Sequence, residues 1–146
     1  DVRDHSPLWI GKLIALPFLI IYTNDVNAYC FREASERYNI PEKLLRAIAR
    51  VESGMNPSAV NKNAGSEDIG LMQINSGWLP VLRRFGIGRN NLWNPCTNVH
   101  VGAWILAKNI ETYGYTWEAV GAYNARSADK RIKYAKLILG ELGKRG

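Results

Sequence analysis

The sequence predicts an α+β fold that is predominantly α-helical, with a small β-hairpin or irregular insertion after the second helix. Three observations support this prediction. Apolar residues recur at helical spacing in several segments. Proline precedes, and glycine follows, several of those segments. A stretch rich in Asn, Ser, Gly and Ala, residues 56–70, separates the first two helices from the others.

The first two helices are predicted from their ends and their apolar spacing. Residues 30–38 are expected to form a short helix. Pro41 begins the second helix, because proline favours the first helical position, and Gly54 ends it. The apolar side of this second helix comprises Leu44, Leu45, Ile48 and Val51. Its opposite side is basic, which is the pattern of an amphipathic helix.

The remaining elements are predicted from capping residues. Residues 56–70 are expected to form turns and one small hairpin. Ser76 would cap a helix that reaches about residue 85, and Asn94 and Pro95 begin the longest helix, up to Tyr113. Further helices are expected over residues 117–125, capped by Thr116, and 128–142, the last one basic and amphipathic.

The length of 146 residues fits one folded domain, and the N-terminal segment is expected to lie outside it. Lys12 precedes an apolar stretch over residues 13–21, and Val26-Asn27-Ala28 has small residues where a signal peptidase reads. We therefore expect a signal peptide over residues 1–28, a mature domain over residues 29–146, and export to the periplasm. The alternative, a membrane anchor, would need an apolar run of about 20 residues.

The net charge of +6 suggests an anionic partner outside the cytoplasm, such as a cell wall or a membrane surface. Nucleic acid is not an expected partner, because the basic residues are scattered and match no DNA-binding motif. The chain also lacks the glycine patterns of nucleotide-binding loops.

Cys30 and Cys96 are expected to form a disulfide, since two cysteines in an exported domain most simply pair with each other. The alternative is two buried free thiols. His100 falls inside the longest predicted helix and is expected to be structural. No cluster of side chains has the spacing of metal ligands, so we expect no metal and no cofactor.

Glu52 is the strongest candidate for chemistry. It lies four residues after Ile48 and seven after Leu45, on the apolar face of the second helix and in its last turn. A carboxyl group placed against apolar side chains resists ionisation, so its pKa should rise. A carboxylic acid that stays protonated near neutral pH can protonate a glycosidic oxygen. The alternative is a glutamate that caps or pairs locally at the helix end.

Several short motifs around Glu52 occur in an order that resembles the soluble lytic transglycosylase domain. The resemblance covers roughly residues 30–127 and is closest to the small transglycosylases that accompany type III secretion and conjugation machines. The motifs are Glu52-Ser53, Gly70-Leu71-Met72-Gln73-Ile74-Asn75, Asn94-Pro95 with Asn98, and Tyr123-Asn124. The resemblance implies a lysozyme-like fold and cleavage of peptidoglycan glycan strands.

The resemblance also implies roles for single residues. Glu52 would protonate the oxygen between N-acetylmuramic acid and N-acetylglucosamine, and then act as base on the muramyl 6-hydroxyl, which closes a 1,6-anhydro ring. Five further residues are expected to bind or orient the substrate: Ser53, Gln73, Asn75, Tyr123 and Asn124. Met72 and Ile74 are expected in the core beneath the groove.

Two features depart from that family. The stretch from Glu52 to Ser76 also resembles chicken-type lysozymes, and Asp68 falls where those enzymes keep a second catalytic carboxylate. We expect Asp68 to contribute to catalysis; the alternative is a turn aspartate. Glu67 would point to the other side of an extended segment and be solvated. Arg126 stands where the family usually has glycine, which puts the turn after Asn124 in question.

Three functions therefore remain open. The first is a lytic transglycosylase that opens the wall locally for a secretion or conjugation apparatus. The second is a lysozyme-type muramidase that hydrolyses the same bond, and the third is a non-catalytic wall-binding assembly factor. The expected partners are peptidoglycan strands and a component of such an apparatus. We expect a monomer without a stable membrane anchor after signal cleavage.

Overall fold

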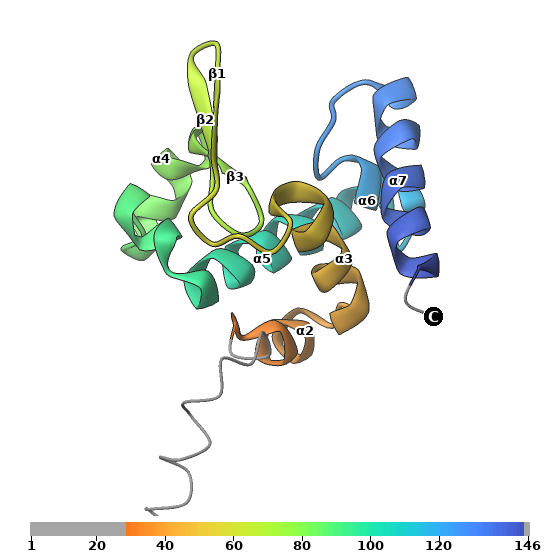
Figure 1. Ribbon diagram of the computed structural model, residues 1–146, viewed down its shortest axis with the longest axis horizontal. Coiled ribbons are helices and arrows are strands. Elements are labelled where there is room, and N and C mark those ends of the chain that lie inside the picture. The colour runs from red at the N-terminus through yellow and green to blue at the C-terminus, as the bar shows by residue number, and fades with distance from the viewer. Residues whose placement is uncertain (1–28, 145–146) are drawn as a thin grey trace, which may run out of the picture.

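The computed structural model describes residues 29–144, so the predicted signal peptide lies outside the described residues. Helix α5 (Pro95–Tyr113) crosses the middle of the molecule. A β-hairpin and short helices lie on one side of it, and α6 (Trp117–Gly121) and α7 (Ala128–Gly143) lie on the other (Figure 1). Within residues 29–144, no helix is both long and apolar enough to span a bilayer. The predicted α+β fold with predominantly helical content is confirmed.

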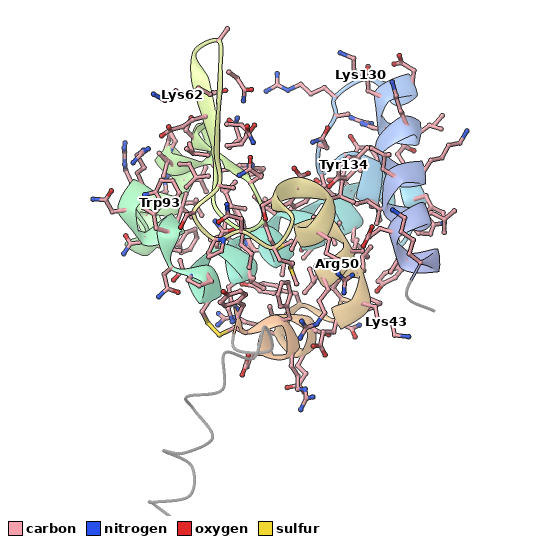
Figure 2. The ribbon with its side chains drawn as sticks, in the orientation of Figure 1. Lys43, Arg50, Lys62, Trp93, Lys130 and Tyr134 are labelled. Carbon is pink, nitrogen blue, oxygen red and sulfur yellow. A yellow bond between two sulfur atoms is a disulfide. The ribbon has the colours of Figure 1, made fainter. Side chains whose placement is uncertain are left out.

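The first two helices agree with the prediction within a residue or two. Helix α2 covers Phe31–Tyr38, and α3 covers Glu42–Ser53. Gly54 ends α3 in the left-handed conformation, at φ 61°, and its N–H returns to the helix carbonyls. Arg50 on α3 forms an ion pair with Glu141 on α7 at 3.9 Å, so the two helices are also linked by charge (Figure 2).

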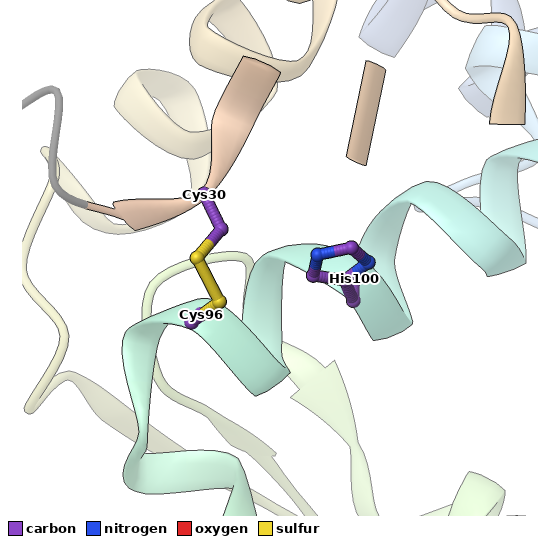
Figure 3. Close-up of side chains that lie close together, drawn as sticks. All are labelled: Cys30, Cys96 and His100. Carbon is purple, nitrogen blue, oxygen red and sulfur yellow. A yellow bond between two sulfur atoms is a disulfide. The ribbon is translucent and has the colours of Figure 1, made fainter. Parts of the chain in front are cut away.

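The predicted disulfide between Cys30 and Cys96 is present, with a Cα–Cα distance of 5.1 Å. It joins the residue before α2 to the first turn of α5, which are 66 residues apart in the chain (Figure 3). A crosslink that closes so long a loop restricts the unfolded chain and stabilises the fold. It also prevents the start of α2 from fraying.

His100 lies beside this disulfide on α5 (Figure 3), and its ring meets the Tyr38 ring edge-on at 6.3 Å. One ring nitrogen of His100 and the two disulfide sulfurs lie within 4.8 Å of one another, a spacing close enough to suggest a metal site. Metal binding by cysteine requires the thiolate, and both sulfurs are already bonded to each other. The cluster is therefore a packing arrangement around a crosslink.

The segment after α3 forms a small antiparallel sheet in the order β1-β2-β3. The predicted hairpin consists of β1 (Val60–Asn63) and β2 (Ser66–Ile69), with Asn61 opposite Asp68. A third strand, β3 (Ile74–Asn75), places Asn75 on the other side of Asp68. Asp68 is therefore flanked by asparagines on both neighbouring strands.

The continuous helix predicted over residues 76–85 is wrong. The chain instead forms η2 (Ser76–Trp78), α4 (Leu79–Leu82) and η3 (Arg83–Phe85), followed by η4 (Arg89–Trp93). The cap is Asn75, whose side chain accepts a hydrogen bond from the Gly77 N–H at 2.9 Å. Pro80 has no N–H to donate to residue 76, so an α-helix that begins at Ser76 cannot form its first bond.

Helices α5 and α6 begin where their caps predict, and α7 begins at Ala128, as expected. The Asn94 side chain accepts from the Thr97 N–H at 3.0 Å, and Thr116 accepts from the Ala119 N–H at 3.3 Å. Helix α6 ends at Gly121, four residues earlier than predicted. A Cβ at Gly121 would lie 2.4 Å from the backbone oxygen of Arg131, so glycine is needed for α6 and α7 to pack this closely.

Asn98 on α5 is a fully buried polar side chain that holds the loop between β2 and β3. Its oxygen accepts from the Met72 N–H at 2.7 Å. Its amide donates to the carbonyl oxygens of Ile69 and Leu92, both at 2.9 Å. Gly70 is required beside it, because a Cβ there would meet the Asn98 amide at 2.4 Å. Met72 and Ile74 are buried in the core, as predicted.

Replacing Asn98 by leucine should destabilise the protein by about 3 kcal/mol or more, because buried donors and acceptors left without partners cost about 1–3 kcal/mol each. The measurement is the free energy of unfolding by urea. Asn90→Leu, at an exposed position of η4, is the matched control and should cost much less. Equal losses for the two variants would show that Asn98 does not hold the loop.

Candidate active site

Glu52 lies in the last turn of α3 and is half-buried. It lines a cleft of about 640 Å³, whose other walls come from the β-hairpin, α5 and the loop between α6 and α7. Leu45 and Ile48, on the same face of α3, are fully buried. The carboxyl group therefore lies where the apolar side of the helix meets the cleft, as its spacing predicted.

Two side chains from the C-terminal part of the chain hold the Glu52 carboxyl. The Tyr134 hydroxyl on α7 donates to Oε1 at 2.7 Å, and the Asn124 amide donates to the same oxygen at 3.3 Å. Tyr134 extends from α7 towards the end of α3 (Figure 2). The carboxyl group is thus fixed by residues 72 and 82 positions away in the sequence.

Burial raises the pKa of Glu52 above its ordinary value of 4.5, because a charged carboxylate loses its hydration there. The hydrogen bonds from Tyr134 and Asn124 oppose this shift, since they stabilise the charged form. The negative charge of Asp68 raises the pKa further. Desolvation is the largest effect, so the net result is a weaker acid that keeps its proton to higher pH.

Tyr134 is the site residue that the sequence analysis missed. It lies in the basic last helix, four residues before Ile138, and is buried together with it. Spacing alone marks both as core positions. Only the general rule that a buried tyrosine hydroxyl needs a partner could have indicated a polar role. The sequence does not say which of the distant acidic residues that partner is.

Asp68 faces the same cleft from β2. Its two carboxylate oxygens are held separately: Oδ2 accepts from the Asn63 amide at 2.8 Å, and Oδ1 accepts from the Asn75 amide at 2.9 Å. Asn75 also lines the cleft, and its own oxygen accepts from the backbone of Gly77. Asn75 therefore orients Asp68 from the neighbouring strand. Glu67 is not freely solvated but forms an ion pair with Arg89.

Gln73 and Tyr123 line the cleft, but their polar groups also bond to the protein. Gln73, in the left-handed conformation at φ 53°, donates to the carbonyls of Gly70 at 3.0 Å and Ala59 at 3.2 Å. Its oxygen accepts from the Asn61 amide at 2.7 Å. Tyr123 donates to the Met72 carbonyl at 2.8 Å. Both side chains therefore hold the wall of the cleft in place through these bonds, and both also face the cleft.

Burial raises the pKa of the Tyr123 hydroxyl well above its ordinary value, and the nearby carboxyl groups of Glu52 and Asp68 raise it further. The pKa of Tyr134 is raised for the same main reason, burial, with Glu52 adding to it. Both phenols therefore stay neutral across the physiological pH range. Tyr134 can thus serve Glu52 as a hydrogen-bond donor at every pH at which the fold operates.

Ser53 is not among the residues that line the cleft. Its hydroxyl lies 2.6 Å from the Leu71 carbonyl oxygen, and it accepts from the Asn56 N–H at 3.1 Å. It therefore joins the end of α3 to the loop held by Asn98. The structure places Ser53 where it positions Glu52 through the backbone.

The rim of the cleft includes Asn124, Arg126 and Trp78. Arg126 is exposed, and its φ lies outside the left-handed region, so this turn does not require the glycine usual in the family. Trp78 meets Trp104 edge-on at 5.5 Å and offers a surface on which a sugar ring can stack. Trp93 does not line the cleft and instead lies under the guanidinium of Arg89.

The site thus combines a carboxyl group of raised pKa on α3 with a second carboxyl group on β2, both lining the same cleft. A protonated carboxyl can transfer its proton to a leaving oxygen. Amide and carboxylate groups around it can bind hydroxyl and acetamido groups. This arrangement is suited to cleaving a glycosidic bond.

Comparison with known proteins gives consistent results. The family described as "Transglycosylase SLT domain" matches residues 29–136. The chain is 45% identical over 129 residues to "Invasion protein IagB" of Salmonella typhimurium, covering 82% of this chain and 81% of the relative. It is 50% identical over 117 residues to "Protein IpgF" of Shigella flexneri, covering 76% and 77% respectively.

The fold is also similar to a solved structure, an inactive variant of the lytic transglycosylase Slt from Pseudomonas aeruginosa. The TM-score is 0.63 at 20% identity, over 77% of this chain. The match covers only 22% of that much longer chain. This likeness shows that the two proteins share the fold over this region.

Replacing Glu52 by glutamine should stabilise the protein at neutral pH. Glutamine keeps an oxygen that accepts from Tyr134 and Asn124, and it has no charge to desolvate. The pKa of Glu52 is higher in the folded state than its ordinary value of 4.5, so the wild-type protein loses stability relative to the variant as pH rises through the folded pKa. The difference amounts to about 1.4 kcal/mol per unit of separation between the two pKa values.

The measurement is urea unfolding of both proteins at pH 4 and pH 8, with Glu36→Gln on exposed α2 surface as the control for losing one negative charge. The advantage of Glu52→Gln should be present at pH 8 and shrink towards pH 4. An advantage that stayed constant with pH, or that grew on acidification, would show that the pKa of Glu52 is not raised.

Proposed function

Since the chain belongs to the transglycosylase SLT domain family and is a peptidoglycan lytic transglycosylase, we propose that it cleaves the β-1,4 bond between N-acetylmuramic acid and N-acetylglucosamine with Glu52 as the catalytic acid. The observation that carries the proposal is the Glu52 carboxyl itself. It opens onto the cleft, its pKa is raised by burial, and Tyr134 and Asn124 fix its orientation.

The reaction proceeds in two steps. Glu52 donates its proton to the glycosidic oxygen, the bond from that oxygen to C1 of the muramyl residue breaks, and positive charge develops on the sugar. The Glu52 carboxylate then takes the proton of the muramyl 6-hydroxyl, whose oxygen bonds to C1 and closes the 1,6-anhydro ring. No water is consumed, and Glu52 ends the cycle protonated.

Asp68 stabilises the positive charge that develops during the first step. It lines the cleft from β2, on a different element from Glu52, and the amides of Asn63 and Asn75 hold its two oxygens in place. The same position supports a second candidate function. A carboxylate on this wall could stabilise the sugar cation long enough for water to attack, as in a lysozyme-type muramidase.

The remaining cleft residues bind the glycan strand. Gln73 and Asn75 form the wall on the sheet side, and Tyr123 and Asn124 form the wall on the side of α6. Ser53 acts indirectly, because its bond to the Leu71 carbonyl holds the end of α3. Trp78 supplies an apolar surface at the edge of the cleft.

The proposed cellular role is local opening of the wall for a secretion or conjugation apparatus. The similarity to Invasion protein IagB supports it, because that relative's name associates it with invasion. We further propose that residues 1–28 are a signal peptide and that residues 29–146 act in the periplasm as the catalytic domain. The family match, which begins at residue 29, supports this boundary.

Mass spectrometry of the muropeptides released from purified peptidoglycan tests the reaction. Wild-type protein should release products that end in 1,6-anhydromuramic acid and are one water lighter than reducing ends. Glu52→Gln should lower the rate by about 10²-fold or more, because the general acid is lost. Glu36→Gln, on the exposed side of α2, should cleave at the wild-type rate.

Each other outcome has a defined meaning. Products with reducing ends would show that water completes the reaction, which would contradict 1,6-anhydro ring closure and favour a lysozyme-type muramidase. Normal cleavage by Glu52→Gln would remove Glu52 from the catalytic role.

A further inference from the structure

A second hollow lies outside the cleft, between α6 and α7, and its walls are mainly apolar. It measures about 370 Å³ and is lined by Trp117, Glu118, Ala128, Arg131, Ile132, Ala135, Lys136 and Leu139. Large apolar side chains in it are open to solvent: Trp117 is 46% exposed, Ile132 58% and Leu139 51%. A cluster of exposed apolar side chains marks an interaction site more often than single exposed apolar residues scattered over the surface do.

The apolar side chains on α7 form a regular stripe. Ala128, Ile132, Ala135 and Leu139 follow one another at spacings of four, three and four residues. This is the spacing of a helix that packs along a second helix. Trp117 on α6 forms the other wall, so the stripe forms one side of the groove. Among residues 29–144, no helix occupies the position that the stripe faces.

The charges around this groove are mainly positive. Lys136 lines it and forms no ion pair with an acidic side chain within residues 29–144. Glu118 is the acidic residue of the lining, and Arg131 pairs with it at 3.2 Å. The groove therefore complements a partner with apolar residues along its centre and acidic residues at its edges.

We propose that the groove between α6 and α7 binds an amphipathic helix of a partner protein, with an apolar stripe and acidic flanks. A second copy of this chain fits less well, because its own groove is flanked by the same basic residues, Arg131 and Lys136. A membrane surface also fits less well, because a flat surface does not fill the hollow between α6 and α7. A helix inserts its side chains there readily.

Leu137 provides a matched control within the same helix. It is 56% exposed, about as much as Ile132 and Leu139, but it does not line the groove. A helix bound in the groove would bury Ile132 and Leu139 and leave Leu137 open. An anionic membrane would attract all three apolar side chains together with the lysines.

The proposal is tested with a synthetic helical peptide that carries leucine at alternating spacings of four and three residues and glutamate at the flanking positions. Binding to the exported protein is followed by NMR, with the Trp117 indole N–H as reporter. The peptide should shift this signal. Ile132→Asn and Leu139→Asn should each weaken binding by about tenfold or more, since a large apolar contact is lost. Leu137→Asn should bind as the wild type does.

A second peptide with lysine in place of glutamate should bind at least about tenfold more weakly, because it faces the basic rim. Three results would overturn the proposal. The first is a Trp117 signal that the glutamate peptide leaves unshifted, and the second is a loss of binding in Leu137→Asn as large as that in Ile132→Asn. The third is equal binding of the glutamate and lysine peptides, which would show that the groove does not select acidic flanks.

Two further measurements distinguish the other occupants. Binding to phosphatidylglycerol vesicles that falls equally with Leu137→Asn and Ile132→Asn would assign the surface to a membrane instead. A dimer in sedimentation that Ile132→Asn dissociates would assign it to a second copy. Because the groove lies outside the cleft, Ile132→Asn should still cleave peptidoglycan. Failure of the groove proposal is therefore separable from failure of the proposed reaction.

Discussion

The buried amide of Asn98 is the constraint on which the cleft depends. Two of its hydrogen bonds, with Ile69 and Met72, fix the loop between β2 and β3 to the start of α5, and the third holds the Leu92 carbonyl of η4. The same loop then receives two other elements: Ser53 at the end of α3 binds the Leu71 carbonyl, and Tyr123 after α6 binds the Met72 carbonyl. One short loop therefore sets the relative positions of the sheet, the catalytic helix and the C-terminal helices. A buried asparagine can do this only because all its polar groups are satisfied.

Glu52 acquires its properties from this convergence. Ser53 holds the end of α3 against the loop, and α7 packs closely enough, across Gly121, to bring Tyr134 onto the carboxyl group. Burial raises the pKa of Glu52, while the hydrogen bonds from Tyr134 and Asn124 limit the rise and fix the direction of the carboxyl. The site therefore carries a cost in stability at neutral pH, which is the usual consequence of tuning a carboxyl group for acid catalysis.

The sequence predicted the features that depend on local patterns. The position of Glu52 on an apolar helix face, the caps Asn94 and Thr116, and the disulfide between Cys30 and Cys96 all follow from spacing, capping preferences or cysteine count. It failed where several local preferences compete, as in residues 76–85. It also missed Tyr134, because a tyrosine at a core position of a helix looks the same whether its hydroxyl meets a distant carboxyl group or a backbone carbonyl.

Acid catalysis at this site requires that the Glu52 carboxyl keep its proton to a higher pH than an ordinary glutamate does. The most direct measurement is a pH titration of the Glu52 side-chain carboxyl carbon by NMR, assigned by its absence in Glu52→Gln. We expect a pKa clearly above 4.5, because desolvation outweighs the two hydrogen bonds. A pKa at or below 4.5 would contradict it, since an ionised carboxylate could not act as the acid that breaks the glycosidic bond.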